Sequence, residues 1–163
     1  MKQLLCLLVI TSLIFYSCEK DDDKDYRDIF EGTYSTDILG VLSFINADGE
    51  TLPFETIDAK ADIVVNKMGG NQLMLIFGRE YMTVTIDEDG DFNIPPESFS
   101  EDFTDPDTGM EATMNITISI TGSITNKKLY IKETYSGDAL IELNGVKERL
   151  DIAGAIVYNG QKK

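Results

Sequence analysis

The stretch MEATMNITISITGSI, Met110–Ile124, decides the fold class of this chain. Its apolar side chains alternate with polar ones, mostly hydroxyls; the apolar positions are Ala112, Met114, Ile116, Ile118, Ile120 and Ile124. Successive side chains of a β-strand point to opposite faces, whereas a helix would scatter these residues around its circumference. The stretch therefore predicts a long antiparallel strand with one apolar face and one face in water.

Turn residues divide the rest of the chain into similar segments. The expected turns lie at Asp48-Gly49, Gly69-Gly70, Asp89-Gly90, Asp107-Thr108-Gly109 and Asn144-Gly145. Between them we predict eight or nine strands and no amphipathic helix of three turns. A short strand around Phe92 is expected to end at Pro95-Pro96, which leaves Pro95–Met110 as a long acidic loop over one mouth of the fold.

Consecutive hairpins joined by short connections form a meander. A meander with one apolar face loses its exposed edges when it closes on itself. We therefore predict one all-β domain over residues 30–160, an antiparallel up-and-down β-barrel of about eight strands. The alternative is a β-sandwich of two sheets, which would require Greek-key crossings between them.

The segments Phe30–Tyr34 and Gly122–Ile131, together with the run of hairpins, resemble the calycin-like, lipocalin-like β-barrel lipoproteins of Bacteroidetes. The resemblance covers Ile29–Asn159 and implies a barrel that carries a ligand. Lipocalins have a Gly-x-Trp near the first strand, and Gly32-x-Tyr34 stands in the equivalent place here. The resemblance also implies a basic residue near the last strand that packs on this ring, a role expected for Arg149.

The N-terminus predicts export and a lipid anchor. One lysine, Lys2, precedes the apolar run Leu4–Phe15, which is much shorter than the roughly 20 residues that span a bilayer. Residues 1–17 are therefore expected to be a signal peptide. Phe15–Cys18 resembles a bacterial lipobox, which implies that Cys18 is acylated; residues 18–29 then form an acidic tether that resembles the export signal of surface lipoproteins. We expect a lipid-anchored protein of the outer membrane, facing the cell surface rather than the periplasm.

Composition excludes several classes of function. Removing residues 1–17 removes Lys2 and no acid, so 13 of the 14 cations remain against 29 carboxylates, a net charge of −16. Such a charge repels nucleic acids. The chain has no histidine, and its two cysteines are Cys6 in the signal peptide and Cys18. We therefore predict no enzyme, no metal site and no cofactor, since the usual catalytic triads and zinc ligands are missing.

Candidate ligand contacts are the side chains predicted to face the barrel interior. An eight-stranded barrel is just wide enough to be filled by its own side chains or to hold one small ligand. The residues selected are Tyr34, Ile38, Met82, Ile118, Glu133 and Tyr135. Glu133 follows Leu129 and Ile131 at every second position along the predicted strand, so its side chain is expected on the same, interior face. A carboxylate buried there needs a partner such as Arg79 or Arg149.

These patterns lead to two hypotheses of function. The first is a non-catalytic surface lipoprotein whose barrel binds a small apolar or glycan-derived ligand. The alternative is an interaction or hydrolase-inhibitor module with a packed, unliganded barrel, which would contact an outer-membrane or host protein through the expected loop Pro95–Met110. An interior hollow with a few polar groups among apolar walls would favour the first hypothesis.

Overall fold

The computed structural model describes residues 25–104, 110–143 and 145–163. The predicted signal peptide, Cys18, the tether up to residue 24 and the predicted turns at residues 107–109 and Asn144 lie outside these residues. Within the described part of the chain, no helix is both long enough and apolar enough to cross a membrane.

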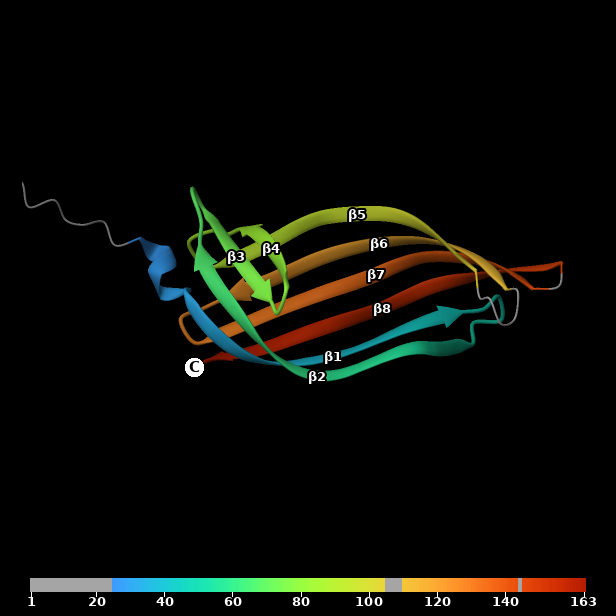
Figure 1. The fold of residues 1–163 in the computed structure, drawn as a ribbon, viewed down its shortest axis with the longest axis horizontal. Helices are drawn as coiled ribbons and strands as arrows, with labels where there is room; N and C mark the ends of the chain where they lie inside the picture. Colours follow the sequence, from blue (N-terminus) through green and yellow to red (C-terminus); the bar gives the residue numbers. More distant parts are fainter. Residues whose placement is uncertain (1–24, 105–109, 144) are drawn as a thin grey trace, which may run out of the picture.

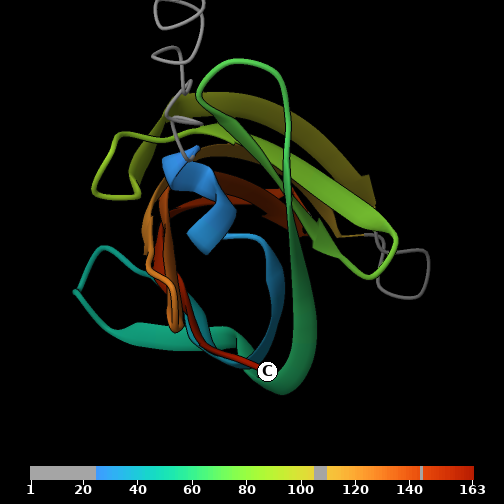
Figure 2. The same cartoon turned by 90° about the vertical axis from the view of Figure 1, so that its left-hand side faces the viewer.

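One short 3₁₀ helix, η1 (Tyr26–Ile29), precedes eight antiparallel strands. The strands are β1 (Gly32–Ile45), β2 (Thr51–Lys67), β3 (Gln72–Phe77), β4 (Glu80–Thr85), β5 (Asp91–Thr104), β6 (Glu111–Ile124), β7 (Lys128–Leu143) and β8 (Val146–Lys162). They form a single sheet in the order β4-β3-β2-β1-β8-β7-β6-β5, so the first and last strands pair. The predicted up-and-down barrel is confirmed; β4 and β5 are its edges, and it is nearly closed between them (Figures 1 and 2).

The barrel has a closed end and an open half because β3 and β4 are short. Each has 6 residues, whereas the other strands have 14 to 17. β3 pairs with β2 only over Ile63–Lys67. Beyond that point six strands continue as a curved sheet without β3 and β4 (Figure 1). The open half comprises residues 38–45, 51–61, 94–104, 111–120, 133–143 and 146–156.

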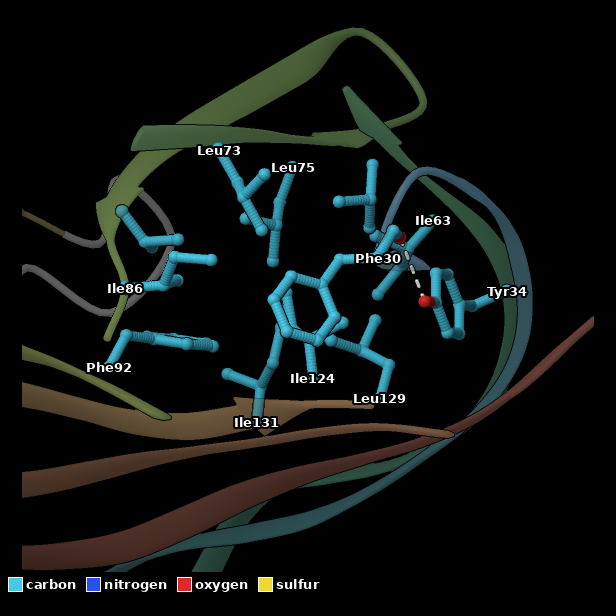
Figure 3. Close-up of a cluster of buried hydrophobic side chains, with 12 residues drawn as sticks. Phe30, Tyr34, Ile63, Leu73, Leu75, Ile86, Phe92, Ile124, Leu129 and Ile131 are labelled. Atoms are coloured by element: carbon cyan, nitrogen blue, oxygen red, sulfur yellow. Dashed lines mark hydrogen bonds between the residues drawn. The ribbon is translucent and has the colours of Figure 1, made fainter. Parts of the chain in front are cut away.

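The hydrophobic core fills the closed end (Figure 3). Its buried members come from strands β1 to β7 and from the residues that follow η1 and β4: Phe30, Tyr34, Ile63, Val65, Leu73, Leu75, Val84, Ile86, Phe92, Ile124, Leu129 and Ile131. The hydroxyl of Tyr34 donates to the carbonyl oxygens of Phe30 at 2.8 Å and Thr125 at 3.0 Å. Burial of each large apolar side chain contributes about 1.5–3 kcal/mol, so this cluster is the main source of stability. Fewer large apolar side chains are buried in the open half: Leu42, Leu150, Ile152 and Ile156.

Arg27 of η1 links Asp25, the residue before this helix, to the turn between β2 and β3. Arg27 Nε and Nη2 donate to the two carboxylate oxygens of Asp25 at 2.9 and 2.7 Å. Arg27 Nη1 donates to the carbonyl oxygens of Met68 and Gly70 in the turn. The hydrogen bond from Arg27 lowers the pKa of Asp25 to about 2. Residues 25–27 are therefore fixed to the closed end of the barrel.

Glycines allow the open half to bend. A Cβ on Gly137 of β7 would lie 1.9 Å from the carbonyl oxygen of Asn115, and one on Gly154 of β8 would lie 2.4 Å from that of Val41. No side chain fits at either distance. Tyr135 pairs with Gly154 across the β7–β8 ladder, so a large ring stands beside a position without a side chain. Glycine kinks of this kind give a sheet the curvature that a barrel needs.

The expected loop Pro95–Met110 is wrong over its first ten residues. β5 runs through Pro95-Pro96 to Thr104, with a shift of register between Ile94 and Glu97. Proline cannot donate to a ladder, but β5 is an edge strand with one unpaired side, where prolines are tolerated and discourage aggregation. An acidic edge strand therefore stands where the sequence suggested an interaction loop.

Candidate functional site

Glu133 lies near the middle of β7 on the concave face, where the closed end passes into the open half. Residues directly opposite in an antiparallel pair share a face, and Glu133 pairs with Ile120 of β6 and Ile156 of β8. Tyr135 Oη donates to Glu133 Oε2 at 2.6 Å, and Tyr158 Oη donates to Oε1 at 3.0 Å. Two phenols therefore hold one partly buried carboxylate.

The expectation of an arginine partner for Glu133 is wrong. Arg149 pairs with Leu140 across the β7–β8 ladder, on the convex face, and forms an ion pair with Asp138 at 3.3 Å. Arg79 is exposed in the β3–β4 turn. The partner that sequence reasoning missed is Tyr158, whose signal was the alternation of Ile152, Ile156 and Tyr158 along the last strand.

The two phenols are suited to remain hydrogen-bond donors. Burial raises the pKa of Tyr135, and the hydrogen bond to Glu133 raises it further. Burial also raises the pKa of Tyr158, with the charge of Glu133 as the next cause. Both side chains are therefore neutral donors at physiological pH, and they orient the carboxylate without an opposite charge.

A hollow of about 280 Å³ opens beside this carboxylate. The β3–β4 hairpin forms one wall and β7 and β8 form the other; the lining residues are Phe77, Glu80, Tyr81, Met82, Glu133 and Tyr158. The rings of Phe77 and Tyr158 meet edge to face, with centroids 5.8 Å apart. The predicted contacts Met82 and Glu133 thus share one hollow, with an aromatic pair as part of its lining.

Ile38, Ile118 and Tyr135 lie near this hollow on the same face. Ile38 pairs with Tyr158 across β1 and β8, and Ile118 pairs with Tyr135 across β6 and β7. Ile118 also lines a smaller hollow of about 140 Å³ toward β5; its other lining residues are Ile94, Pro95, Glu97, Phe99 and Ile120. Five of the six predicted contacts therefore lie on adjoining parts of the concave surface.

Tyr34 is separate from the other five. It is 0% exposed in the core of the closed end, and its hydroxyl is engaged by two carbonyl oxygens. The ammonium of Lys162, at the end of β8, lies 6.0 Å from the centre of its ring. The basic residue expected over this ring is therefore Lys162, and the expectation of Arg149 is wrong because the register carries that residue to the convex face.

A larger hollow of about 420 Å³ lies at the far tips of β5–β8. Most of its lining belongs to the convex face, where Lys147 and Glu142 form an exposed ion pair at 3.0 Å. Exposed pairs of this kind contribute little stability or specificity. We therefore place the candidate site at Glu133, on the concave face.

The arrangement at Glu133 suits binding. Two protonated phenols, one carboxylate, aromatic rings and a thioether can hold and orient a ligand, since polar groups among apolar walls define a small-molecule site. Among the residues that the structure describes, no three histidine, cysteine or acidic side chains are grouped so that they could hold a metal ion. No family model and no curated protein matches the chain, so the molecule is defined by its fold, an eight-stranded up-and-down β-barrel that is open along one half.

Proposed function

We propose that this protein is a non-catalytic lipoprotein, anchored to the outer membrane through Cys18 and facing the cell surface, whose barrel binds a small ligand with an apolar body. The ligand lies on the concave face beside Glu133. The observation that carries the proposal is the hollow there, which combines apolar and aromatic walls with a carboxylate held by two tyrosines.

The apolar surface of the open half supports this proposal over a packed barrel. Ile116, Ile118 and Ile120 face the interior from β6 but are only partly buried, whereas Ile124 on the same strand is fully buried in the core. Phe99 of β5, which pairs with Ile116, is 44% exposed. Apolar side chains left uncovered along a concave face gain free energy when a ligand removes them from water, about 25 cal/mol per Å².

The polar groups beside the hollow would give the ligand its orientation. Glu133 accepts two hydrogen bonds from tyrosines, and a carboxylate offers about four acceptor positions, so two positions are available to a ligand donor. A ligand that fills the apolar surface and donates to this carboxylate would satisfy both parts of the site. These are the features of small-molecule pockets in other folds.

A dye-binding experiment with matched tryptophan variants tests the proposal. An uncharged, environment-sensitive apolar dye such as N-phenyl-1-naphthylamine is titrated into the full mature chain carrying Cys18→Ser, which avoids detergent. Ile118→Trp fills the concave surface and is expected to reduce dye binding at least tenfold. Thr121→Trp adds the same ring to the exposed convex face of β6 and is expected to bind like the parent.

Unfolding midpoints of both variants establish that each is folded at the temperature of the titration. Equal dye binding by the two folded variants would show that the concave surface is not where apolar molecules bind. Absence of binding by the parent would count against the proposal directly.

A further inference from the structure

The concave face of the open half carries acidic side chains and no basic ones among the described residues. The register of the ladders places five glutamates of the open half on the concave face, and a sixth, Glu80 of β4, lies on this face at the border of the closed end; the five are Glu55, Glu97, Glu101, Glu133 and Glu148. Within the described ranges no lysine or arginine occupies a concave position in the open half, because the ladders place its three cations on the convex face: Lys60, Lys147 and Arg149.

The three cations on the convex face of the open half form ion pairs with acidic side chains on that same face. Lys60 lies 2.8 Å from Asp37, Lys147 lies 3.0 Å from Glu142, and Arg149 lies 3.3 Å from Asp138. None of the six concave glutamates has an ion pair with any described residue. The inner surface is therefore apolar and negatively charged, and its glutamates have no cationic partner among the residues that the structure describes.

The hollow beside Glu133 has a second feature that suits a cation. Phe77 and Tyr158, which meet edge to face, line it together with the carboxylate. The faces of aromatic rings attract ammonium groups, and the attraction is stronger when the group is removed from water. Glu133 is oriented by Tyr135 and Tyr158 and retains two acceptor positions for the donors of such a group.

We propose that the ligand is an organic cation, an apolar body carrying an ammonium group, with the ammonium at Glu133 and the apolar body along the isoleucines of the open half. This inference rests on the proposed function and names the chemical class of its ligand. Charge complementarity selects this class: the six glutamates repel an apolar anion such as a fatty acid, and a neutral ligand would leave the negative charge of Glu133 without an opposite charge.

Three probes of matched shape test the inference by calorimetry. They are 4-phenylbutylamine, 4-phenylbutanol and 4-phenylbutyrate, which share an apolar body and differ in charge. The protein is the full mature chain carrying Cys18→Ser. The amine is expected to bind at least tenfold more tightly than the alcohol, the acid to bind more weakly than either, and the preference for the amine to decrease as salt is raised.

Single variants locate the cation. Glu133→Gln is expected to weaken binding of the amine about tenfold, which corresponds to about 1.4 kcal/mol, and to leave binding of the alcohol unchanged. Glu142→Gln is the matched control, because Glu142 lies on the same strand with its side chain on the convex face. Should Glu133→Gln fail to fold, the salt dependence of the parent protein still separates the amine from the alcohol.

The outcomes distinguish this inference from the proposed function. Equal binding of the amine and the alcohol, unaffected by Glu133→Gln or by salt, overturns the inference and leaves an apolar binding site in place. Tightest binding by the acid also overturns it. Failure of all three probes, together with failure of the apolar dye, overturns the proposed function as well.

Discussion

Replacing one isoleucine by alanine at each end of the barrel would test whether only the closed end is packed. Ile131 of β7 is 0% exposed and belongs to the core cluster. Ile118 of β6 also faces the interior, but it is partly buried and lines a hollow. The two substitutions remove the same atoms from neighbouring strands. Any difference between the losses in free energy of unfolding therefore reports on how tightly the surrounding side chains are packed.

The expected losses in free energy of unfolding differ severalfold between the two variants. Isoleucine to alanine in a packed core lowers the free energy of unfolding by about 2–5 kcal/mol, because an enclosed cavity adds to the lost burial. We expect about 4 kcal/mol for Ile131→Ala, which is enclosed on every side. At Ile118 no enclosed cavity forms and the side chain already meets solvent, so we expect about 1 kcal/mol.

Urea unfolding followed by far-ultraviolet circular dichroism measures both values. The difference of about 3 kcal/mol exceeds the uncertainty of linear extrapolation, which is about 10–15% of the total. An unchanged denaturant slope in both variants would show that the compactness of the unfolded chain is the same. Equal losses for the two variants would refute the reasoning, because they would mean that the open half is as tightly packed as the core and has no room for a ligand.

Three further predictions concern single residues. Tyr34→Phe removes the donor to the buried carbonyl oxygen of Phe30 and the partly buried one of Thr125, and is expected to lower the free energy of unfolding by about 1–3 kcal/mol, measured by the same urea titration; an unchanged value would contradict the role given to this hydroxyl. Because the pKa of Asp25 falls from 3.8 to about 2 on folding, its contribution to stability is present above pH 3.8 and lost as the pH falls toward 2. The unfolding midpoints of the parent and Asp25→Asn should therefore differ at pH 5 and converge near pH 2, and a constant difference would exclude this mechanism. Cys18→Ala should move the protein from the membrane fraction to the soluble fraction on cell fractionation, and retention in the membrane would show that Cys18 is not the anchor.

Much of the fold follows from local patterns. The alternation in Met110–Ile124 predicts β6, and the residues that it assigns to one face are those that the ladders place on the concave surface. The same parity argument correctly puts Glu133 on the face of Leu129 and Ile131. These predictions succeed because the direction of a side chain along a strand depends only on the residues next to it.

Local patterns failed where position in the sheet mattered. Pro95-Pro96 was expected to end a strand, yet β5 continues because it lies at an edge where one side of the ladder is unpaired. Arg149 was expected beside Glu133 or Tyr34, yet the register of β8 turns it outward, and Tyr158 and Lys162 occupy those places. β8 pairs with β7 without a shift of register, and Arg149 alternates with the buried Leu150 and Ile152, so its side chain points to the opposite face.

The amino-acid sequence by itself determined that this chain forms strands, how many there are, and which side chains share a face, because these properties arise within a few residues. Only the tertiary structure decided that the barrel packs at one end and lies open along the other, and that two tyrosines hold Glu133 beside a hollow. These features depend on which strands pair and over what length. Pairing joins residues far apart in the chain, and its free energy comes from the assembled sheet rather than from any one segment.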